Sequence, residues 1–294
     1  MNTPKIGVVG FPGNAPTEAL VRTVGKKTGF RCLVDMENVC LDLDRGRVMF
    51  GNLDLSSLDA LIIKKIGSEY SPDLLGRLQI LDDLQKKGVR CFSKPDRIIK
   101  LLDRLGCTTQ LSAGGIPIPP TLVTESVQTA ADAVNRFGKA VLKPLYTSKA
   151  RGMRVLEAGN GILREIENYK AEGNRIIYVQ RMVPLPGQDL GITFLGGRYL
   201  ATYARVGHKT SWNTTTHSGG RYRPYTPTDD LIELARKAQA LFDLDFTCVD
   251  LVETPDGPKV FEVSAFGGYR GLQEAHNIDV ARMNVEYVLN QLKK

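Results

Sequence analysis

Apolar and polar positions follow two different periods along the N-terminal third of the chain. Short apolar runs bounded by turn residues are typical of buried strands, and apolar residues three or four positions apart are typical of amphipathic helices. The strands predicted in this way span residues 5–10, 30–37, 46–50, 58–67 and 89–95, and the helices span residues 17–29 and 71–88. Because strands that alternate with helices form parallel sheets, we expect a largely parallel α/β sheet here.

The pattern changes after residue 95. A helical period runs over residues 96–113 and stops at GGIPIPPT, where proline and glycine cannot continue a helix. Residues 189–207 alternate like a hairpin that turns at Gly196 and Gly197, so we expect antiparallel strands beyond the hinge. Further helices are predicted over residues 126–138, 161–173, 226–244 and 280–294, and further strands within residues 139–157, 175–183, 246–254 and 258–268.

These elements group into three parts. The predicted division is an N-terminal α/β domain at residues 1–95, a central part at residues 96–180 and a C-terminal part at residues 181–294. Helices and antiparallel strands mix in the last two parts, which is typical of α+β lobes. Two lobes behind an N-terminal domain predict a cleft between them.

The composition is that of an ordinary globular protein. Of 294 residues, 42% are hydrophobic and 24% are charged, which excludes wholesale disorder and leaves room for more than one domain. No run approaches the roughly 18 apolar residues that a membrane span requires, and the start lacks a cationic leader, so we expect no contact with a membrane. Five widely spaced cysteines without a CxxC pair argue against a disulfide framework or a zinc site and predict a cytoplasmic protein.

The net charge restricts the chemical class of the binding partners only in part. The chain carries 39 basic and 32 acidic residues, a formal net charge of +7. This excess favours anionic partners such as nucleotides or phosphorylated metabolites, but paired lysines that merely solvate the surface explain it equally well. Nucleic acid is disfavoured as a partner, because no segment interleaves basic and aromatic residues for base stacking.

An acidic pair carries the first chemical signal. The usual phosphate-binding glycine loops are absent, which disfavours a Walker ATPase and a simple Rossmann dehydrogenase. Asp250 in CVDLVET and Glu262 in FEVSAFGG lie on neighbouring predicted strands, each flanked by apolar residues. Two buried carboxylates are costly unless they hold a hard divalent cation, pair with arginine or reach solvent. The spacing alone leaves these alternatives open.

The string CVDLVETPDGPKVFEVSAFGGYRG resembles the metal-binding end of ATP-grasp carboxylate–amine ligases. The likeness is strongest to the RimK type, which attaches glutamate to protein or cofactor acceptors. Upstream, the segment GGIPIPP is similar to the family's hinge, and VLKPLYTSKARGM is similar to its strand lysine and phosphate-binding lid. YVQRMV resembles its adenine hinge, and SWNTTTHSGG resembles a segment near its reacting groups. Order and spacing agree over about residues 58–283.

The resemblance implies an ATP-grasp fold in which ATP lies between the central and C-terminal lobes. The activity it implies is ATP-dependent ligation of a carboxylate donor to an amine acceptor through an acyl phosphate. The nucleotide residues it implies are Lys100, Arg104, Lys143, Ser148, Gly152, Gln180, Arg181, Met182, Val183 and Asp189. It assigns Mg²⁺, with Mn²⁺ as an alternative ion, to Asp250, Glu262 and Ser264. It assigns the reacting groups to Arg205, His217 and Arg270.

Several family positions are changed in this chain. Arg104 replaces the first phosphate lysine, for which Lys100 is the alternative, and Ser264 replaces an asparagine metal ligand. Further changes fall on Leu190, Gly191, Asn213, Thr215 and on the lid residues Thr147 and Ala150, where glycines are typical. These changes touch acceptor and phosphate contacts more than the metal carboxylates, so they favour a changed substrate, and glutamate is not carried over.

Two other functions remain open from the sequence. A nucleotide-binding regulatory or scaffold protein would keep the ATP site without turnover, and a phosphotransferase would need one acceptor instead of an acid and an amine. The family often forms homo-oligomers, but no exposed apolar stripe in the sequence identifies an interface.

Overall fold

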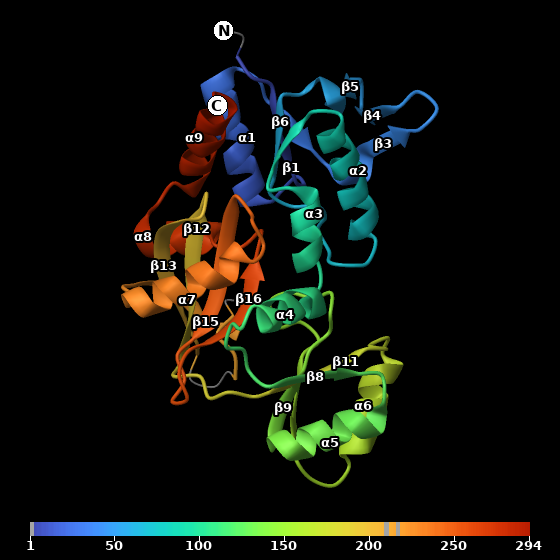
Figure 1. The fold of residues 1–294 in the computed structure, drawn as a ribbon, viewed down its shortest axis with the longest axis vertical. Coiled ribbons are helices and arrows are strands. Elements are labelled where there is room, and N and C mark those ends of the chain that lie inside the picture. The colour runs from blue at the N-terminus through green and yellow to red at the C-terminus, as the bar shows by residue number, and fades with distance from the viewer. Residues whose placement is uncertain (1–2, 209–211, 216–217) are drawn as a thin grey trace.

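The N-terminal part is a four-stranded parallel sheet with helices on both faces (Figure 1). The computed structural model describes residues 3–208, 212–215 and 218–294. In sheet order the strands are β2 (Leu33–Val34), β1 (Ile6–Val9), β6 (Ala60–Ile63) and β7 (Arg90–Phe92). Helix α1 (Ala15–Thr28) packs with Ile6 and Val8, whereas α2 (Leu74–Lys86) packs with Val9 and Leu61 on the other face. The predicted parallel sheet is confirmed.

A small antiparallel sheet is inserted between β2 and β6. It consists of β3 (Val39–Asp42), β4 (Arg47–Phe50) and β5 (Leu53–Asp54), between the 3₁₀ turns η1 (Met36–Asn38) and η2 (Leu55–Ser57). The turn from β3 to β4 is closed by Asp42, whose Oδ1 accepts a hydrogen bond from the Arg45 N–H at 3.0 Å. A turn this short cannot hold the crossover connection that parallel strands need. These strands are therefore antiparallel and depart from the parallel pairing expected of the region.

The central sheet is antiparallel and contains β10 (Arg154–Glu157), β9 (Lys139–Leu142), β11 (Ile177–Arg181) and β8 (Thr121–Thr124), in that order. Helices α5 (Val127–Phe137) and α6 (Ile162–Ala171) cover one face, where Leu142 and Val179 are buried. Because successive side chains of a strand point to opposite faces, Tyr178 and Gln180 of β11 point away from these helices. They therefore face the rest of the molecule.

The C-terminal sheet is also antiparallel, in the order β14 (Arg221–Tyr225), β13 (Arg198–Val206), β12 (Gln188–Leu195), β15 (Phe246–Val252) and β16 (Lys259–Ser264). The predicted β12–β13 hairpin is confirmed, and Gly196 and Gly197 take φ values of 56° and 73°. Helix α7 (Asp229–Ala240) packs on the face that carries Val249 and Leu251. The opposite face therefore carries the polar residues of these strands.

Residues 96–113 do not form the one helix that the periodicity predicts. They contain α3 (Pro95–Ile98), the 3₁₀ turn η3 (Ile99–Leu101) and α4 (Arg104–Ala113). Asp103 interrupts the helix with φ −120° and ψ 161°, and its Oδ1 accepts a hydrogen bond from the Gly106 N–H at 2.7 Å. This N-cap makes Arg104 the first residue of α4 and separates it from Lys100.

The last two helices return the chain to the N-terminal part. Helix α8 (Tyr269–His276) packs on the C-terminal sheet, and α9 (Val280–Leu292) lies beside α1 (Figure 1). The Lys27 ammonium and a Glu286 carboxylate oxygen lie 3.0 Å apart across the α1–α9 contact. The central sheet lies at the opposite end of the molecule, with α4 and the C-terminal sheet between (Figure 1).

The sequence did not predict α8 or β14.

Helix α4 contacts β16 of the C-terminal sheet, and the Val260 N–H donates to the Pro117 carbonyl at 2.8 Å, so residues before the central sheet pack on the C-terminal one. The predicted boundaries at residues 95 and 180 stay predictions. Within the described residues, no helix is both long and apolar enough to cross a membrane.

Candidate active site

Four charged residues meet on one face of the C-terminal sheet. Asp189 on β12 lies opposite Arg205 on β13, and Asp250 on β15 lies opposite Glu262 on β16. Strand β12 also pairs with β15, with Gly191 opposite Asp250. The predicted proximity of the two carboxylates therefore follows from strand register, and the sheet adds a third carboxylate and a guanidinium to them.

Arg205 is held between two carboxylates. Its Nε lies 3.1 Å from each oxygen of Asp189, its Nη2 also contacts Asp189, and Nη2 lies 2.9 Å from Asp250 Oδ2. Thr214 Oγ1 donates to Asp189 Oδ1 at 2.6 Å. Burial would lower the pKa of Arg205, but Asp250 and Asp189 raise it well above its usual value. Arg205 is therefore a fixed cation whose position these two carboxylates determine.

Asp250 has a different electrostatic environment from an exposed carboxylate. Its side chain is 19% exposed. Burial raises the pKa of Asp250, Arg205 opposes this rise, and the nearby charge of Glu262 adds to it. A cation near the free oxygens of Asp250 and Glu262 would relieve both effects, which fits a metal-binding role.

Gly191, one of the changed family positions, has a packing explanation. A Cβ at this position would lie 2.2 Å from Cζ of Tyr203, so no side chain fits beside that ring. The Tyr203 hydroxyl lies 3.3 Å from the Cys248 sulfur. Tyr203 therefore fills the space beside the charged cluster that a longer residue at 191 would need.

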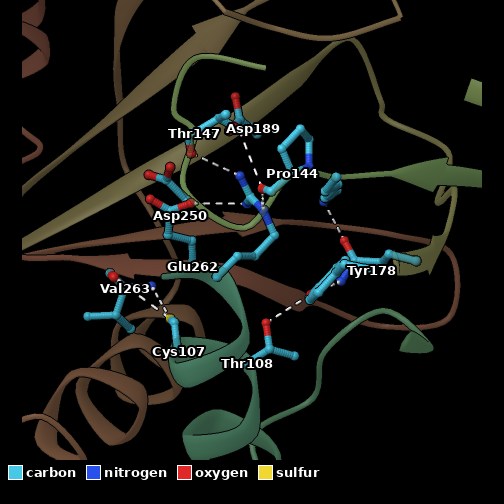
Figure 2. A network of polar contacts seen from close by, with 12 residues as sticks. Cys107, Thr108, Pro144, Thr147, Tyr178, Asp189, Asp250, Glu262 and Val263 are labelled. Carbon is cyan, nitrogen blue, oxygen red and sulfur yellow. Dashed lines mark hydrogen bonds and ion pairs between the residues drawn. The ribbon is translucent and has the colours of Figure 1, made fainter. Parts of the chain in front are cut away.

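Arg104 connects α4 to the second carboxylate and to the loop after β9. Its partners Glu262, Pro144 and Thr147 are labelled in Figure 2. Its Nη1 lies 3.5 Å from Glu262 Oε2. Its Nε donates to the Pro144 carbonyl at 3.4 Å, and its Nη2 donates to the Thr147 carbonyl at 3.2 Å. The side chain is only 8% exposed. Arg104 thus holds the start of the predicted lid against β16.

Lys143, at the end of β9, enters the same region from the central sheet. Its Nζ donates to Gln180 Oε1 at 2.5 Å and lies 5.3 Å from the centre of the Phe261 ring. Burial, with Arg104 adding, lowers the pKa of Lys143 to about 7. A nearby anion would stabilise the protonated form of Lys143 beside the Arg104 guanidinium, so this position suits phosphate oxygens.

The predicted adenine hinge follows β11. The N–H groups of Arg181 and Met182 donate to the carbonyls of Pro120 and Lys139 at 2.8 and 2.9 Å. The buried Val183 N–H, in contrast, has no backbone acceptor within residues 3–208, 212–215 and 218–294. The Arg181 side chain points toward Asp256, with Nη2 and Oδ2 3.7 Å apart. The main chain at Val183 is therefore the part of the hinge that remains able to bind a base edge.

Hydrogen bonds among Gln180, Tyr178 and Thr108 support the predicted adenine hinge. Gln180 Nε2 donates to the Tyr178 hydroxyl at 3.1 Å. That hydroxyl lies 2.8 Å from Thr108 Oγ1 of α4 (Figure 2). Tyr178 thus points toward α4. Val179 lies in the core under α5 and α6, so it does not share a face with Tyr178.

The lid adopts left-handed backbone conformations without glycine at each of them. Lys149 and Ala150 have φ values of 59° and 58°, and Gly152 has 66°. Left-handed φ is costly for residues with a Cβ. Lys149 and Ala150 therefore hold conformations that glycine would adopt at lower cost. Ser148 lies in the same turn, where its carbonyl accepts a hydrogen bond from the Arg151 N–H at 3.3 Å.

The remaining predicted residues differ in how closely they join this cluster. Ser264 Oγ accepts hydrogen bonds from the N–H groups of Phe266 and Gly267 at 3.2 and 3.0 Å, so its hydroxyl supports a turn. Arg270 is exposed, forms an ion pair with Glu274 on α8 at 2.5 Å and lies over the Tyr222 ring. Lys100 lies on η3, outside the helix that carries Arg104. His217 lies outside the described residues.

A cleft that is open to solvent lies beside Arg104 and Glu262. Arg104 and Cys107 of α4, Ser148 of the lid, and Glu262 of β16 all line it. Tyr70, from the N-terminal part, also lines this cleft. Within the described residues, no group of three His, Cys, Asp or Glu side chains gathers as a self-sufficient metal site. Any ion here would therefore need ligands from a bound molecule.

Sequence reasoning missed Thr214 and the partnership of Asp189 with Arg205. Thr214 is 8% exposed and lies within SWNTTTHSGG, but nothing in the hydroxyl-rich string distinguishes it from its neighbours. The turn at Gly196 and Gly197 pairs Leu195 with Arg198, but an irregularity between Thr193 and Phe194 then shifts the register by one residue and places Asp189 opposite Arg205. The turn alone would have paired Asp189 with Ala204, so the sequence could not have predicted this contact.

The ion cluster predicts a large and specific effect on stability. Arg205→Met leaves Asp189 and Asp250 without their shared cation, so we expect the free energy of unfolding to fall by about 3–5 kcal/mol in chemical denaturation. Adding Asp189→Asn should recover part of that loss. Arg22→Met, which removes an exposed ion pair with Glu18, is the control and should cost less than about 1 kcal/mol. Equal effects of the two arginine variants would contradict the cluster.

Solved structures share this fold over almost the whole chain. The ATP-grasp ligase PsnB, complexed with a minimal precursor, superimposes with a TM-score of 0.77, 17% identity and coverage of 98% of this chain and 99% of that one. A RimK domain ATP-grasp protein from Sphaerobacter thermophilus superimposes with a TM-score of 0.73, 20% identity and coverage of 97% and 99%. The predicted ATP-grasp fold is therefore confirmed.

Sequence comparison agrees with the fold. The chain is 24% identical over 322 aligned residues to a tetrahydromethanopterin:alpha-L-glutamate ligase of Methanosarcina acetivorans, an alignment that covers 98% of this chain and 99% of that ligase. The family model for the RimK-like ATP-grasp domain matches residues 101–288. That match spans well over half of the chain and includes α4, the central sheet and the charged cluster, so this protein belongs to the RimK-like ATP-grasp family.

Proposed function

We propose that this protein is a ligase that uses ATP to join a carboxylate to an amine through an acyl phosphate. The observation that carries the proposal is the register of Asp250 opposite Glu262, with Arg205 beside one carboxylate and Arg104 beside the other. Phosphoryl transfer needs charge neutralisation and positioning more than covalent participation by the protein. Two carboxylates on paired strands, each with a guanidinium beside it, provide such an arrangement.

ATP would lie between the central and C-terminal sheets. The Val183 N–H would bind the adenine edge, and the backbone beside it at Gln180, Arg181 and Met182 would form the hinge. Lys143 and Arg104 supply positive charge for the phosphates, and the lid from Ser148 to Gly152 would cover them. The left-handed turn at Lys149 and Ala150 supports this role, because such turns expose successive N–H groups to anions.

The donor set fits Mg²⁺, or Mn²⁺ in its place. Asp250 and Glu262 offer hard oxygens, and Mg²⁺ is usually held by one or two carboxylates together with substrate phosphates. The Ser264 hydroxyl, which supports a turn through two N–H groups, would be at most a secondary ligand. When bound, the ion would neutralise charge on the phosphates.

The chemistry then divides into two balanced steps. A carboxylate oxygen of the donor attacks the γ-phosphorus, the bond to the ADP oxygen breaks, and an acyl phosphate forms. The acceptor amine attacks the acyl carbon, phosphate leaves, and the amine loses a proton as the amide forms. Arg205 would stabilise the transferring phosphoryl group, while Asp189 and Thr214 keep its guanidinium in place.

The substrates are proposed only as classes. The relatives that bear the name of alpha-L-glutamate ligases make L-glutamate the first amine to try, whereas the changes at Leu190, Gly191, Asn213 and Thr215 favour testing other amino acids beside it. Arg270 and exposed cations of the lid would favour anionic substrates. All five cysteines are free thiols, which supports a reducing compartment, the cytoplasm.

The test is ADP release measured with acids and amines supplied separately and together. We expect Mg²⁺-dependent release only when both substrates are present. Glu262→Gln should keep the melting temperature and lose about 100-fold or more of this activity, because even changes outside a metal's ligands cost 10–100-fold. Glu233→Gln, on the surface of α7, is the control. ATP binding without release would favour a scaffold, and release with a single acceptor would favour a phosphotransferase.

Nucleotide binding should also be linked to a proton. The pKa of Lys143 is lowered to about 7, so near pH 8 its amine is mostly neutral, and nearby phosphates would raise that pKa and protonate it. Calorimetric titration of ADP and Mg²⁺ at pH 8, in buffers of different ionisation enthalpy, should therefore report proton uptake. Lys143→Arg, which is always charged, should abolish the uptake. Equal uptake by both proteins would contradict the role of Lys143.

A further inference from the structure

Two consecutive lysines follow β6 and make different contacts. Lys64 is 3% exposed, its Nζ donates to the Phe266 carbonyl at 2.7 Å, and it lies 3.7 Å from the centre of the Tyr269 ring. Lys65 instead lies between two other rings, with Nζ 5.4 Å from the centre of Tyr70 and 5.1 Å from that of Phe266. Lys64 therefore joins the N-terminal and C-terminal parts, whereas Lys65 is available for another role.

Among the residues that the structure describes, the Lys65 ammonium has no anionic or hydrogen-bonding partner. Across residues 3–208, 212–215 and 218–294, its ammonium forms no ion pair and donates no hydrogen bond. The side chain is only partly exposed, so its charge has lost part of its hydration. The two rings offset some of this loss through cation–π attraction, but an ammonium has three N–H donors that rings satisfy poorly. Such a site favours an added anion.

The surroundings of Lys65 place it at the wall of the candidate active site. Tyr70 and Phe266, the two rings that flank its ammonium, both line the cleft that Arg104 and Glu262 line. Glu262 and the lid residue Lys149 are close enough to act electrostatically on the Lys65 charge. Lys65 therefore belongs to the end of the cleft that the N-terminal part closes.

Two other cations near Glu262 already have acceptors. Lys143 donates to Gln180, and Arg104 donates to the carbonyls of Pro144 and Thr147. Lys143 enters from β9 of the central sheet and Arg104 from α4, and both are proposed to meet the phosphates of ATP. Lys65 enters from the N-terminal part, so a different anionic group must meet it.

We propose that Lys65 binds a carboxylate of a ligation substrate, and that this carboxylate is not the one that receives the phosphoryl group. The substrate class is an amino acid, or a peptide end, that keeps a free carboxylate beside its reacting group, with Tyr70 and Phe266 flanking the carbon chain. This inference rests on the proposed function, because only a ligation would bring such a substrate to the cleft. Lys65 acts here as a specificity-determining residue, and the phosphoryl transfer does not use it.

The test is calorimetric binding of L-glutamate to the full chain loaded with ADP and Mg²⁺. Lys65→Met should weaken L-glutamate binding at least about tenfold, which is the usual effect of removing a charge-assisted hydrogen bond, and Lys65→Arg should recover most of it. Lys26→Met, which removes an exposed lysine of α1, is the matched control and should bind as the unaltered protein does. Binding of ADP and Mg²⁺ should be unchanged in all variants.

Two further probes identify the carboxylate. 4-Aminobutyrate lacks the α-carboxylate of L-glutamate, and L-glutamine lacks the side-chain carboxylate. The probe whose binding no longer depends on Lys65 has therefore lost the carboxylate that Lys65 binds. The proposal is overturned if Lys65→Met binds L-glutamate as tightly as the unaltered protein, or if the unaltered protein binds none of the probes. Failure of the ligase function would appear separately, as absent ADP release with Lys65-dependent binding intact.

Discussion

The candidate active site depends on the ion cluster of Arg205 with Asp189 and Asp250. Three adjacent strands each contribute one member, so the positions of the charges follow from the register of β13, β12 and β15. Removing any member would leave a partly buried charge without its partner, which is far more costly than losing a surface ion pair. The cluster therefore fixes both the guanidinium proposed to meet the transferring phosphoryl group and one carboxylate proposed to bind metal.

A second contact joins this sheet to the central one. Arg104 begins α4, and from there it reaches Glu262 on β16 and the carbonyls of Pro144 and Thr147 on the way to the lid. The lysine expected at this position from related proteins would offer one ammonium, whereas the planar guanidinium has several directed donors. Arginine at residue 104 therefore links α4, β16 and the loop after β9 at once.

The sequence predicted the parts of this arrangement that follow from periodicity. Asp250 and Glu262 interrupt apolar strands joined by a short turn, so their proximity could be inferred from the amino-acid sequence. The Gly196–Gly197 turn indicated the β12–β13 hairpin. The break at Asp103 could not be inferred, because apolar residues continue at helical spacing through it and only the capping hydrogen bond to Gly106 reveals it. The packing of Tyr203 against Gly191 is likewise a tertiary contact without a local signal.

The central claim is that Asp250 and Glu262 jointly hold the metal that accompanies ATP. A crystal structure with a non-hydrolysable ATP analogue and Mn²⁺, collected at a wavelength where manganese scatters anomalously, tests it most directly. The account predicts an anomalous peak within coordination distance of both carboxylates, about 2–2.3 Å, and of the analogue's phosphate oxygens. A peak that touches neither carboxylate, or an analogue bound away from Lys143 and Arg205, would contradict it.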